Sequence, residues 1–193
     1  MEERYPFLVM RVLTGAVIAA ATLLPVGAFV ADPAASRVEF FVRDNRGGFA
    51  GVVRAMEVRV AVREDGDAFA ADVEARFDAA SLTTGNGLRD SQMRREFLQT
   101  DRHPVILFHG TAVPQARPGG LPFPATLRGT LTLRGVSREV EIPLRVTALA
   151  DAYLAEGRLT IRLSEFGIPV PRFLIFVAED PVAVSFKIRL VRR

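Results

Sequence analysis

The sequence predicts an all-β protein, an antiparallel up-and-down barrel of about eight strands with one short helix. Two observations favour this fold. Apolar and polar residues alternate with a period of two through most of the chain, as in strands that bury one face. Turn sequences such as EDGD at residues 64–67 and RGV at residues 134–136 separate these stretches, so consecutive strands are expected to pair as hairpins.

The alternation is clearest from Phe69 to Asp78, where apolar side chains occupy the odd positions and charged ones the even positions from Asp72 onward. Strands are expected in this segment and in seven others: residues 38–42, 52–62, 105–113, 125–134, 139–146, 153–163 and 182–190. Residues 87–98 break the period and predict a helix, with Asn86 as its cap and Met93 and Phe97 one turn apart on the same face.

One-sided strands must bury their apolar faces and protect two sheet edges. A closed barrel solves both problems, and a two-sheet sandwich is the alternative. A barrel of about eight strands is either filled by its own side chains or holds one small guest. Bulky residues such as Phe186 favour the first case, and small residues at inward positions favour an apolar hollow: Ala71, Ala75, Gly129, Ala155 and Gly157.

Composition indicates one globular domain of 193 residues, 49% hydrophobic and 24% charged. The pI of about 10.1 accompanies a net charge of only +3, because few groups titrate between neutrality and pH 10. Basic residues are scattered singly, so no nucleic-acid partner is expected. The absence of Cys excludes disulfides, a zinc ribbon and a lipidated N-terminal Cys.

The N-terminus predicts export. Residues 12–31 are almost wholly apolar, and Pro25 precedes small residues at which a signal peptidase can cut, so residues 1–28 are expected to be a secretory signal. A retained anchor is the alternative, because Glu2 and Glu3 offset the nearby Arg residues and the apolar segment is long enough to span a bilayer. In both cases the remainder lies outside the cytoplasm, in the periplasm or secreted.

The sequence offers no catalytic residue, cofactor motif or metal site, and we expect no enzyme. His103 and His109 would lie about 20 Å apart on one extended strand, too far to share a metal ion. Glu139 and Glu141 share a face about 7 Å apart, but the Arg-bearing surroundings indicate a solvated exterior. No nucleophile elbow, phosphate loop or zinc-protease motif is present.

Three segments in this order resemble the YceI-like family: SLTTGNGLRD at residues 81–90, EFL at 96–98 and RHPVILF at 102–108. Further similarity lies in GTLTLRGV at 129–136 and SEFGI at 164–168, and the resemblance extends over about residues 35–190. It implies a lipocalin-like barrel over residues 32–193 that is periplasmic or secreted. Some members hold polyisoprenoid chains and others different amphiphiles.

The sequence departs from the family pattern at two places near the first hairpin. An aromatic often follows the Gly at position 51 by two residues, where this chain has Val53, and a His is common at the position of Asp44. The local pocket shape and the exact ligand therefore stay open.

Two groups of residues are candidates for the site. The apolar group is expected to contact the ligand: Phe40, Val42, Phe69, Val73, Met93, Phe97, Leu107, Leu131, Phe166, Ile168, Phe173, Phe176 and Phe186. The segment 166–177 either lines the pocket mouth or covers the barrel end. The polar group either orders the loop before the helix or contacts a ligand head group: Thr83, Asn86, Arg89 and Asp90.

The resulting hypothesis is extracytoplasmic binding or carriage of a polyisoprenoid or other long-chain amphiphile in an apolar barrel cavity. Burying ten to fifteen methylenes at about 0.8 kcal/mol each gives roughly 8–12 kcal/mol, so such a site needs no specific polar contact. The alternative is a barrel packed solid that acts as an interaction module of the cell envelope. The expected partner is the amphiphile, without nucleic acid or metal, and homodimerisation stays open.

Overall fold

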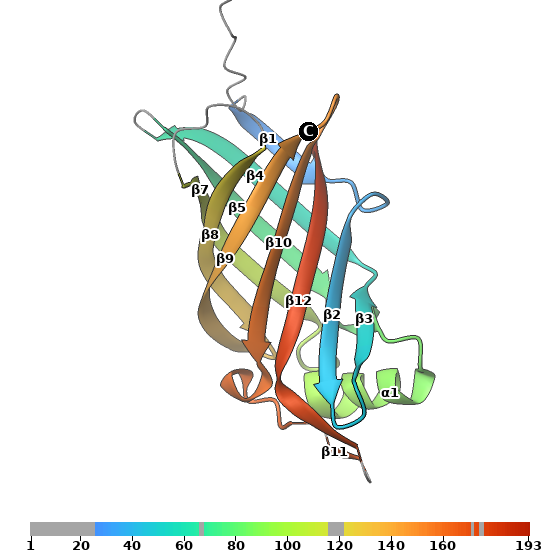
Figure 1. Ribbon diagram of the computed structural model, residues 1–193. Helices are drawn as coiled ribbons and strands as arrows, with labels where there is room; N and C mark the ends of the chain where they lie inside the picture. The colour runs from blue at the N-terminus through green and yellow to red at the C-terminus, as the bar shows by residue number, and fades with distance from the viewer. Residues whose placement is uncertain (1–25, 66–67, 116–121, 171, 174–175) are drawn as a thin grey trace, which may run out of the picture.

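The computed structural model describes residues 26–65, 68–115, 122–170, 172–173 and 176–193. Eight antiparallel strands form a closed barrel (Figure 1). In order around the barrel they are β1 (Gly27–Ala31), β4 (Met56–Asp65), β5 (Ala68–Asp78), β7 (Val105–Pro114), β8 (Phe123–Leu133), β9 (Val136–Ala148), β10 (Tyr153–Arg162) and β12 (Phe176–Arg192). The predicted barrel is confirmed, and the sandwich alternative is wrong.

The barrel is closed by β1, which pairs on one side with β4 and on the other with β12. Val30 lies opposite Arg59 of β4 and opposite Val191 of β12. This short strand thus joins the two edges that the rest of the sheet would leave exposed, so the backbone donors and acceptors there are paired within the molecule.

A small extension of the sheet continues the wall at the lower end of Figure 1. Strand β12 has 17 residues. On its side away from β10, residues 190–192 pair with β1, and residues 178–187 pair with β2 (Arg37–Asp44), which in turn pairs with β3 (Phe49–Val53). Strand β3 in turn pairs with β6 (Leu82–Thr83), while β11 (Arg172–Phe173) pairs with the start of β12. The continuous strand expected over residues 52–62 is therefore wrong: the chain leaves this extension after Val53 and enters the barrel at Met56.

The helical segment lies at the same end of the barrel, called the helix end below (Figure 1). Helix α1 (Gly87–Gln92) is continued by the π-helical turn η2 (Met93–Leu98), so the predicted helix over residues 87–98 is confirmed. The Asn86 side chain accepts a hydrogen bond of 3.1 Å from the Arg89 backbone N–H and caps α1. Two short 3₁₀ turns complete the fold, η1 (Ala79–Ser81) and η3 (Leu163–Phe166).

The carboxylate of Asp90 fixes α1 to the preceding loop. It is only 6% exposed and accepts hydrogen bonds from the Thr83 hydroxyl at 2.6 Å, the Thr84 N–H at 2.8 Å and the Thr84 hydroxyl at 2.7 Å. Burial raises the pKa of Asp90, but these hydrogen bonds and the charge of Arg94 outweigh burial and hold the pKa below its ordinary value. The ionised carboxylate is thus the form that the fold stabilises.

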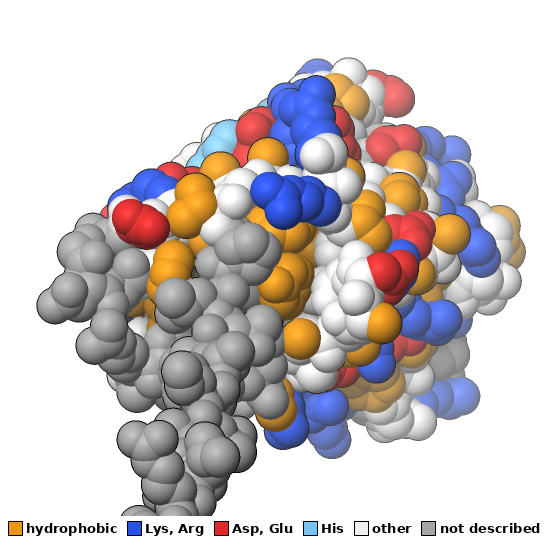
Figure 2. Space-filling view, turned by 90° about the horizontal axis from the view of Figure 1, so that it is seen from above, with side chains coloured by type: hydrophobic (Ala, Val, Ile, Leu, Met, Phe, Trp, Pro, Cys, Tyr) orange, Lys and Arg blue, Asp and Glu red, His pale blue; other side chains and the backbone are white. Residues whose placement is uncertain are grey.

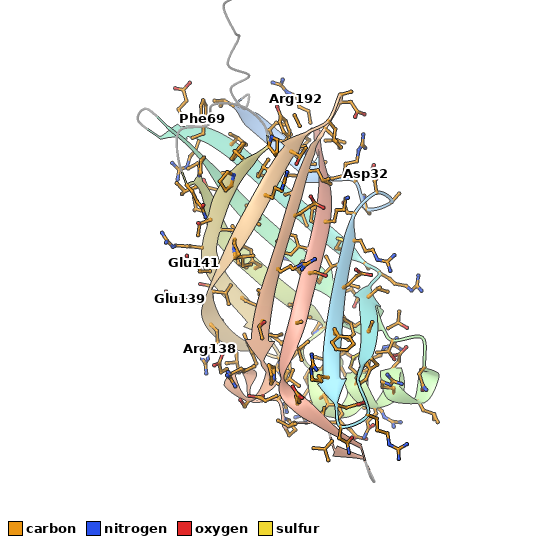
Figure 3. The ribbon with its side chains drawn as sticks, in the orientation of Figure 1. Asp32, Phe69, Arg138, Glu139, Glu141 and Arg192 are labelled. Carbon is orange, nitrogen blue, oxygen red and sulfur yellow. The ribbon has the colours of Figure 1, made fainter. Side chains whose placement is uncertain are left out.

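The outer face of the barrel is charged and solvated. Figure 3 shows Arg138, Glu139 and Glu141 pointing away from the barrel. Glu141 accepts a hydrogen bond of 2.8 Å from Arg128 on the neighbouring strand, which lowers the pKa of its carboxyl. Both partners are exposed, so the pair adds little stability, and the solvated exterior predicted for Glu139 and Glu141 is confirmed.

The barrel begins earlier in the chain than expected. Gly27–Ala31 forms β1, so the barrel starts before the predicted domain start at Asp32 and includes the last two residues of the predicted signal over residues 1–28. Residues 1–25 lie outside the described part of the chain, so the signal or anchor stays a prediction. Within the described part, no helix has the length and apolar character needed to cross a membrane.

Replacing Asp90 with Asn should destabilise the fold by about 1–3 kcal/mol, because one acceptor of a buried hydrogen-bonded carboxylate becomes a donor facing other donors. Urea unfolding followed by circular dichroism measures this change. The exposed Asp101, replaced in the same way, is the matched control and should change stability by less than about 0.5 kcal/mol. Equal effects of the two substitutions would contradict the anchoring role of Asp90.

The same carboxylate predicts a pH dependence of stability. The unfolded chain protonates Asp90 near its ordinary pKa of 3.8, and the folded chain does so only at lower pH. The contribution of Asp90 is therefore complete above the ordinary pKa and is lost as the pH falls through the folded one. As the pH falls below about 5, the wild type should therefore lose more stability than Asp90→Asn. Parallel pH profiles would rule this out.

Candidate functional site

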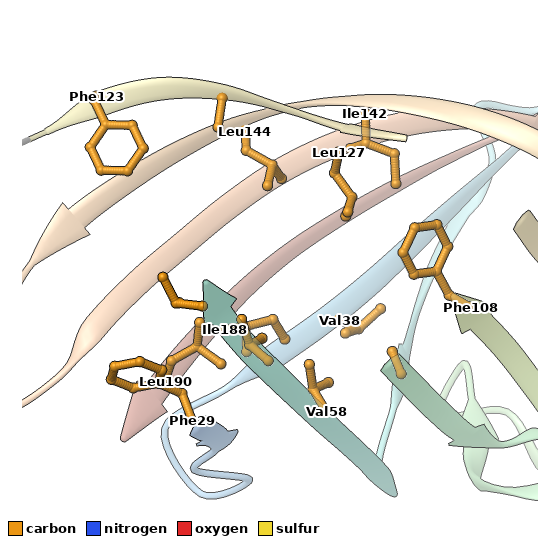
Figure 4. Close-up of a cluster of buried hydrophobic side chains, with 14 residues drawn as sticks. Phe29, Val38, Val58, Phe108, Phe123, Leu127, Ile142, Leu144, Ile188 and Leu190 are labelled. Carbon is orange, nitrogen blue, oxygen red and sulfur yellow. The ribbon is translucent and has the colours of Figure 1, made fainter. Parts of the chain in front are cut away.

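The barrel encloses a cavity of about 820 Å³, within the usual range of about 300–1,000 Å³ for ligand pockets. Side chains from all eight barrel strands form its wall. Figure 4 shows Leu127, Ile142 and Leu144 on one side of the interior and Val38, Val58 and Ile188 on the other. The interior is therefore hollow, and the barrel packed solid with its own side chains is wrong.

The wall is apolar toward the end opposite the helix. Phe29, Phe69, Phe123 and Tyr153 line the cavity there, and the rings of Phe29 and Tyr153 meet edge to face with centroids 5.5 Å apart. Figure 2 looks onto this end and shows hydrophobic side chains toward its middle and charged ones on the visible rim. Among the described wall residues at this end, Tyr153 carries a hydroxyl and the others offer hydrocarbon.

In the part of the chain that the structure describes, charged and amide side chains line the cavity near the helix end alone. Among the described residues they come from the end of β2 and from the helical segment: Asp44, Asn86, Arg89, Gln92, Arg95 and Glu96. The guanidinium of Arg89 lies 4.0 Å from the ring centroid of Phe49, a cation–π contact that holds it at the wall. The cavity is thus amphipathic along its length.

Most of the predicted apolar residues belong to the wall. Those that line the cavity are Phe40, Val42, Phe69, Val73, Met93, Phe97, Leu131, Ile168 and Phe186. Of the predicted polar group, Asn86 and Arg89 also line it, whereas Thr83 and Asp90 hydrogen-bond to each other in the loop before α1. The structure therefore places two of these four side chains at the cavity wall and two in the loop behind it.

Two residues that were predicted to contact the ligand do not line the cavity. Leu107 faces the outside of β7, because its neighbours Ile106 and Phe108 both point into the barrel. Phe166 is 1% exposed and packs in the core beside the cavity, where Ile168 takes the wall position. The side chains of Phe173 and Phe176 lie outside the described part of the structure.

The segment after β10 closes the helix end of the barrel from below. Phe166 and Ile168 are both 1% exposed and pack with Leu82, Leu98 and Val182 in one core cluster. Because Ile168 also lines the cavity, this stretch does both things that the sequence left as alternatives: it covers the barrel end and forms part of the pocket wall.

Sequence reasoning missed two sets of wall residues. The first is a set of buried aliphatic side chains whose strand alternation already pointed inward: Val58, Val60, Leu127, Ile142, Leu144 and Ile188. The second is most of the polar set, namely Asp44, Gln92, Arg95 and Glu96. Asp44 ends β2, whereas the positions of Gln92, Arg95 and Glu96 depend on how the helix docks on the barrel, and no local sequence signal gives that docking.

Glycines lie directly beneath the Phe rings of the wall. A Cβ atom built on Gly51 would lie 2.2 Å from Cζ of Phe40, and one on Gly157 would lie 2.5 Å from Cζ of Phe186. Both pairs are direct cross-strand neighbours. The ring of Phe108 also lies near two glycines, with its Cζ 2.7 Å from a Cβ built on Gly110 of its own strand and 2.8 Å from one on Gly129 of β8. Each ring therefore rests on bare backbone and leaves the centre of the barrel free.

Comparisons with known structures agree on this architecture. BcnA from Burkholderia cenocepacia matches with a TM-score of 0.70 at 19% identity, over 82% of this chain and 98% of that one. A polyisoprenoid-binding domain from Saccharophagus degradans, implicated in plant cell wall breakdown, matches with a TM-score of 0.68 at 17% identity, over 88% and 100% of the two chains. At these identities the likeness shows the fold.

The Campylobacter jejuni YceI protein matches with a TM-score of 0.58 at 16% identity, over 74% of this chain and 84% of that one. No curated protein matches the sequence. The model of the YceI-like domain matches residues 29–190, which run from the middle of β1 nearly to the end of β12. This range includes every described residue that lines the cavity. The chain therefore belongs to the YceI-like domain family.

Proposed function

We propose that this protein binds a polyisoprenoid or another long-chain amphiphile inside the barrel, and that it holds or carries this molecule without chemical conversion. The observation that carries the proposal is the apolar cavity of about 820 Å³. The polyisoprenoid-binding domain of Saccharophagus degradans, which has a similar barrel, supports the ligand class.

The energetics favour a chain-like guest. Ten to fifteen methylenes moved from water into the cavity contribute roughly 8–12 kcal/mol, against an association cost that begins near 4 kcal/mol. Apart from Tyr153, the described side chains that line the cavity away from the helix end are hydrocarbon, so a guest with polar groups along its length would lose its hydration there without compensation. A long hydrocarbon chain has no such groups.

The polarity of the wall orients the guest. A polar head is best placed at the helix end, near Asn86, Arg89 and Gln92, and the apolar tail extends toward Phe69 and Tyr153. Asn86 and Arg89 are therefore proposed to contact the head group, whereas Thr83 and Asp90 order the loop that positions them.

Location outside the cytoplasm, in the periplasm or after secretion, completes the proposal. Cleavage of an N-terminal signal before Gly27 would keep β1 intact and with it the closure of the barrel. A carrier in an aqueous compartment shields an insoluble chain from water, which fits a binding role and needs no catalytic group.

The proposal is tested by placing a polar group in the wall. Leu131→Gln puts an amide into the cavity, and a buried amide without a partner costs about 1–3 kcal/mol, so affinity for a polyisoprenoid alcohol should fall about tenfold or more. Leu107→Gln on the adjacent strand, facing outward, is the matched control and should leave affinity unchanged. Titration with a fluorescent isoprenoid analogue measures the affinity of both variants.

Equal affinity of the wild type and Leu131→Gln would contradict binding within the barrel. Equal loss in both variants, with both still folded by circular dichroism, would place the ligand on the outer surface.

The orientation predicts which amide signals a labelled guest affects. A fatty acid that carries a nitroxide at its tail should broaden the NMR resonances around Tyr153, and one with the nitroxide beside its head should broaden those of α1. The reverse pattern would contradict the proposed head-group position, and broadening confined to exposed residues would contradict binding in the cavity.

A further inference from the structure

Two glycines beside the wall, Gly51 and Gly157, lie beneath Phe rings, and the atoms nearest to a Cβ at either position belong to side chains. A Cβ on Gly51 would have Cζ, Cε1 and Cε2 of Phe40 as its nearest neighbours, at 2.2–2.7 Å. A Cβ on Gly157 would meet Cζ and Cε1 of Phe186 at 2.5 and 3.0 Å and a methyl group of Leu144 at 2.9 Å. All of these neighbours are side-chain atoms, so a larger residue would displace side chains and leave the backbone in place.

Gly110 and Gly129 differ from this pair. A Cβ on Gly110 would lie 2.4 Å from the Arg128 carbonyl oxygen, and one on Gly129 would lie 2.2 Å from the His109 carbonyl oxygen. Backbone atoms cannot move aside without separating β7 from β8. These two glycines are therefore required by the fold, whereas Gly51 and Gly157 are required only by the position of a ring.

The direction of displacement is fixed by the barrel. The ring of Phe186 has β10 behind it and the cavity in front of it, since it lines the wall and lies opposite Gly157. A methyl group at position 157 would push the ring away from the strand and toward the cavity that the ring lines. The same geometry holds for Phe40 above Gly51 near the helix end.

We propose that Gly157 with Phe186, and Gly51 with Phe40, set the width of the cavity and thereby decide whether it admits a methyl-branched chain. With glycine at both positions the rings lie flat and the passage is wide enough for the side methyls of an isoprenoid. With a larger residue at either position the ring narrows the passage, so that an unbranched chain is preferred. This inference rests on the proposed function.

The experiment compares two alcohols with main chains of the same length, phytol, which is methyl-branched, and hexadecan-1-ol, which is not. Binding is measured by displacement of a fluorescent fatty acid from the wild type, Gly157→Ala and Gly51→Ala. In both variants affinity for phytol should fall about tenfold or more relative to hexadecan-1-ol, because an added methylene in a hydrophobic pocket has effects of this size. Gly27→Ala is the matched control, since a Cβ there has ordinary contacts at 3.8–3.9 Å.

A second substitution distinguishes a narrowed passage from a damaged fold. In Gly157→Ala combined with Phe186→Leu the ring is absent, so the affinity for phytol should return toward the wild-type value. Failure of this rescue, with the double variant folded by circular dichroism, would overturn the inference.

The outcomes for the inference and for the proposed function are separate. A wild type that binds neither alcohol nor the fluorescent acid contradicts the proposed function itself. A wild type that binds both alcohols, with an unchanged phytol-to-hexadecanol ratio in the two glycine variants, overturns the inference and leaves the proposed function in place.

Discussion

The pairing of β1 with both β4 and β12 is the contact on which the hollow interior depends. It joins the two edges of a twisted sheet through few residues, Gly27–Ala31, opposite residues 190–192 on one side and 59–62 on the other. Without it the strands would present two open edges and an apolar face to water. With it the apolar faces point inward and enclose a space that side chains need not fill.

The cavity stays open because the wall is thin. Ala71, Ala75 and Ala155 project little, and the large rings of Phe40, Phe108 and Phe186 lie against glycines on neighbouring strands. Closure and openness thus come from different residues: backbone pairing makes the barrel, and small side chains keep its centre free. The helical segment adds the polar groups at one end, held there by the buried carboxylate of Asp90.

The sequence was sufficient where one face of a strand is unambiguous. From Phe69 to Asp78 and in the last strand, alternation identified the inward side chains, and the helix at residues 87–98 followed from its cap and broken period. Leu107 failed because Val105, Ile106, Leu107 and Phe108 are all apolar, so the sequence leaves the phase of β7 open and only pairing with β5 and β8 sets it. The contacts of Phe40 with Gly51 and of Phe186 with Gly157 depend on cross-strand register in the same way, so the sequence alone could not predict them.

The central claim is that a guest molecule occupies the barrel. The most direct test is to identify and quantify any molecule bound to the protein as its own cells make it. Protein purified from the cells that naturally produce it is extracted with organic solvent, and the extract is analysed by mass spectrometry. A long-chain amphiphile is expected in an amount close to that of the protein. An empty extract, together with no uptake of added polyisoprenoid by the purified protein, would contradict it.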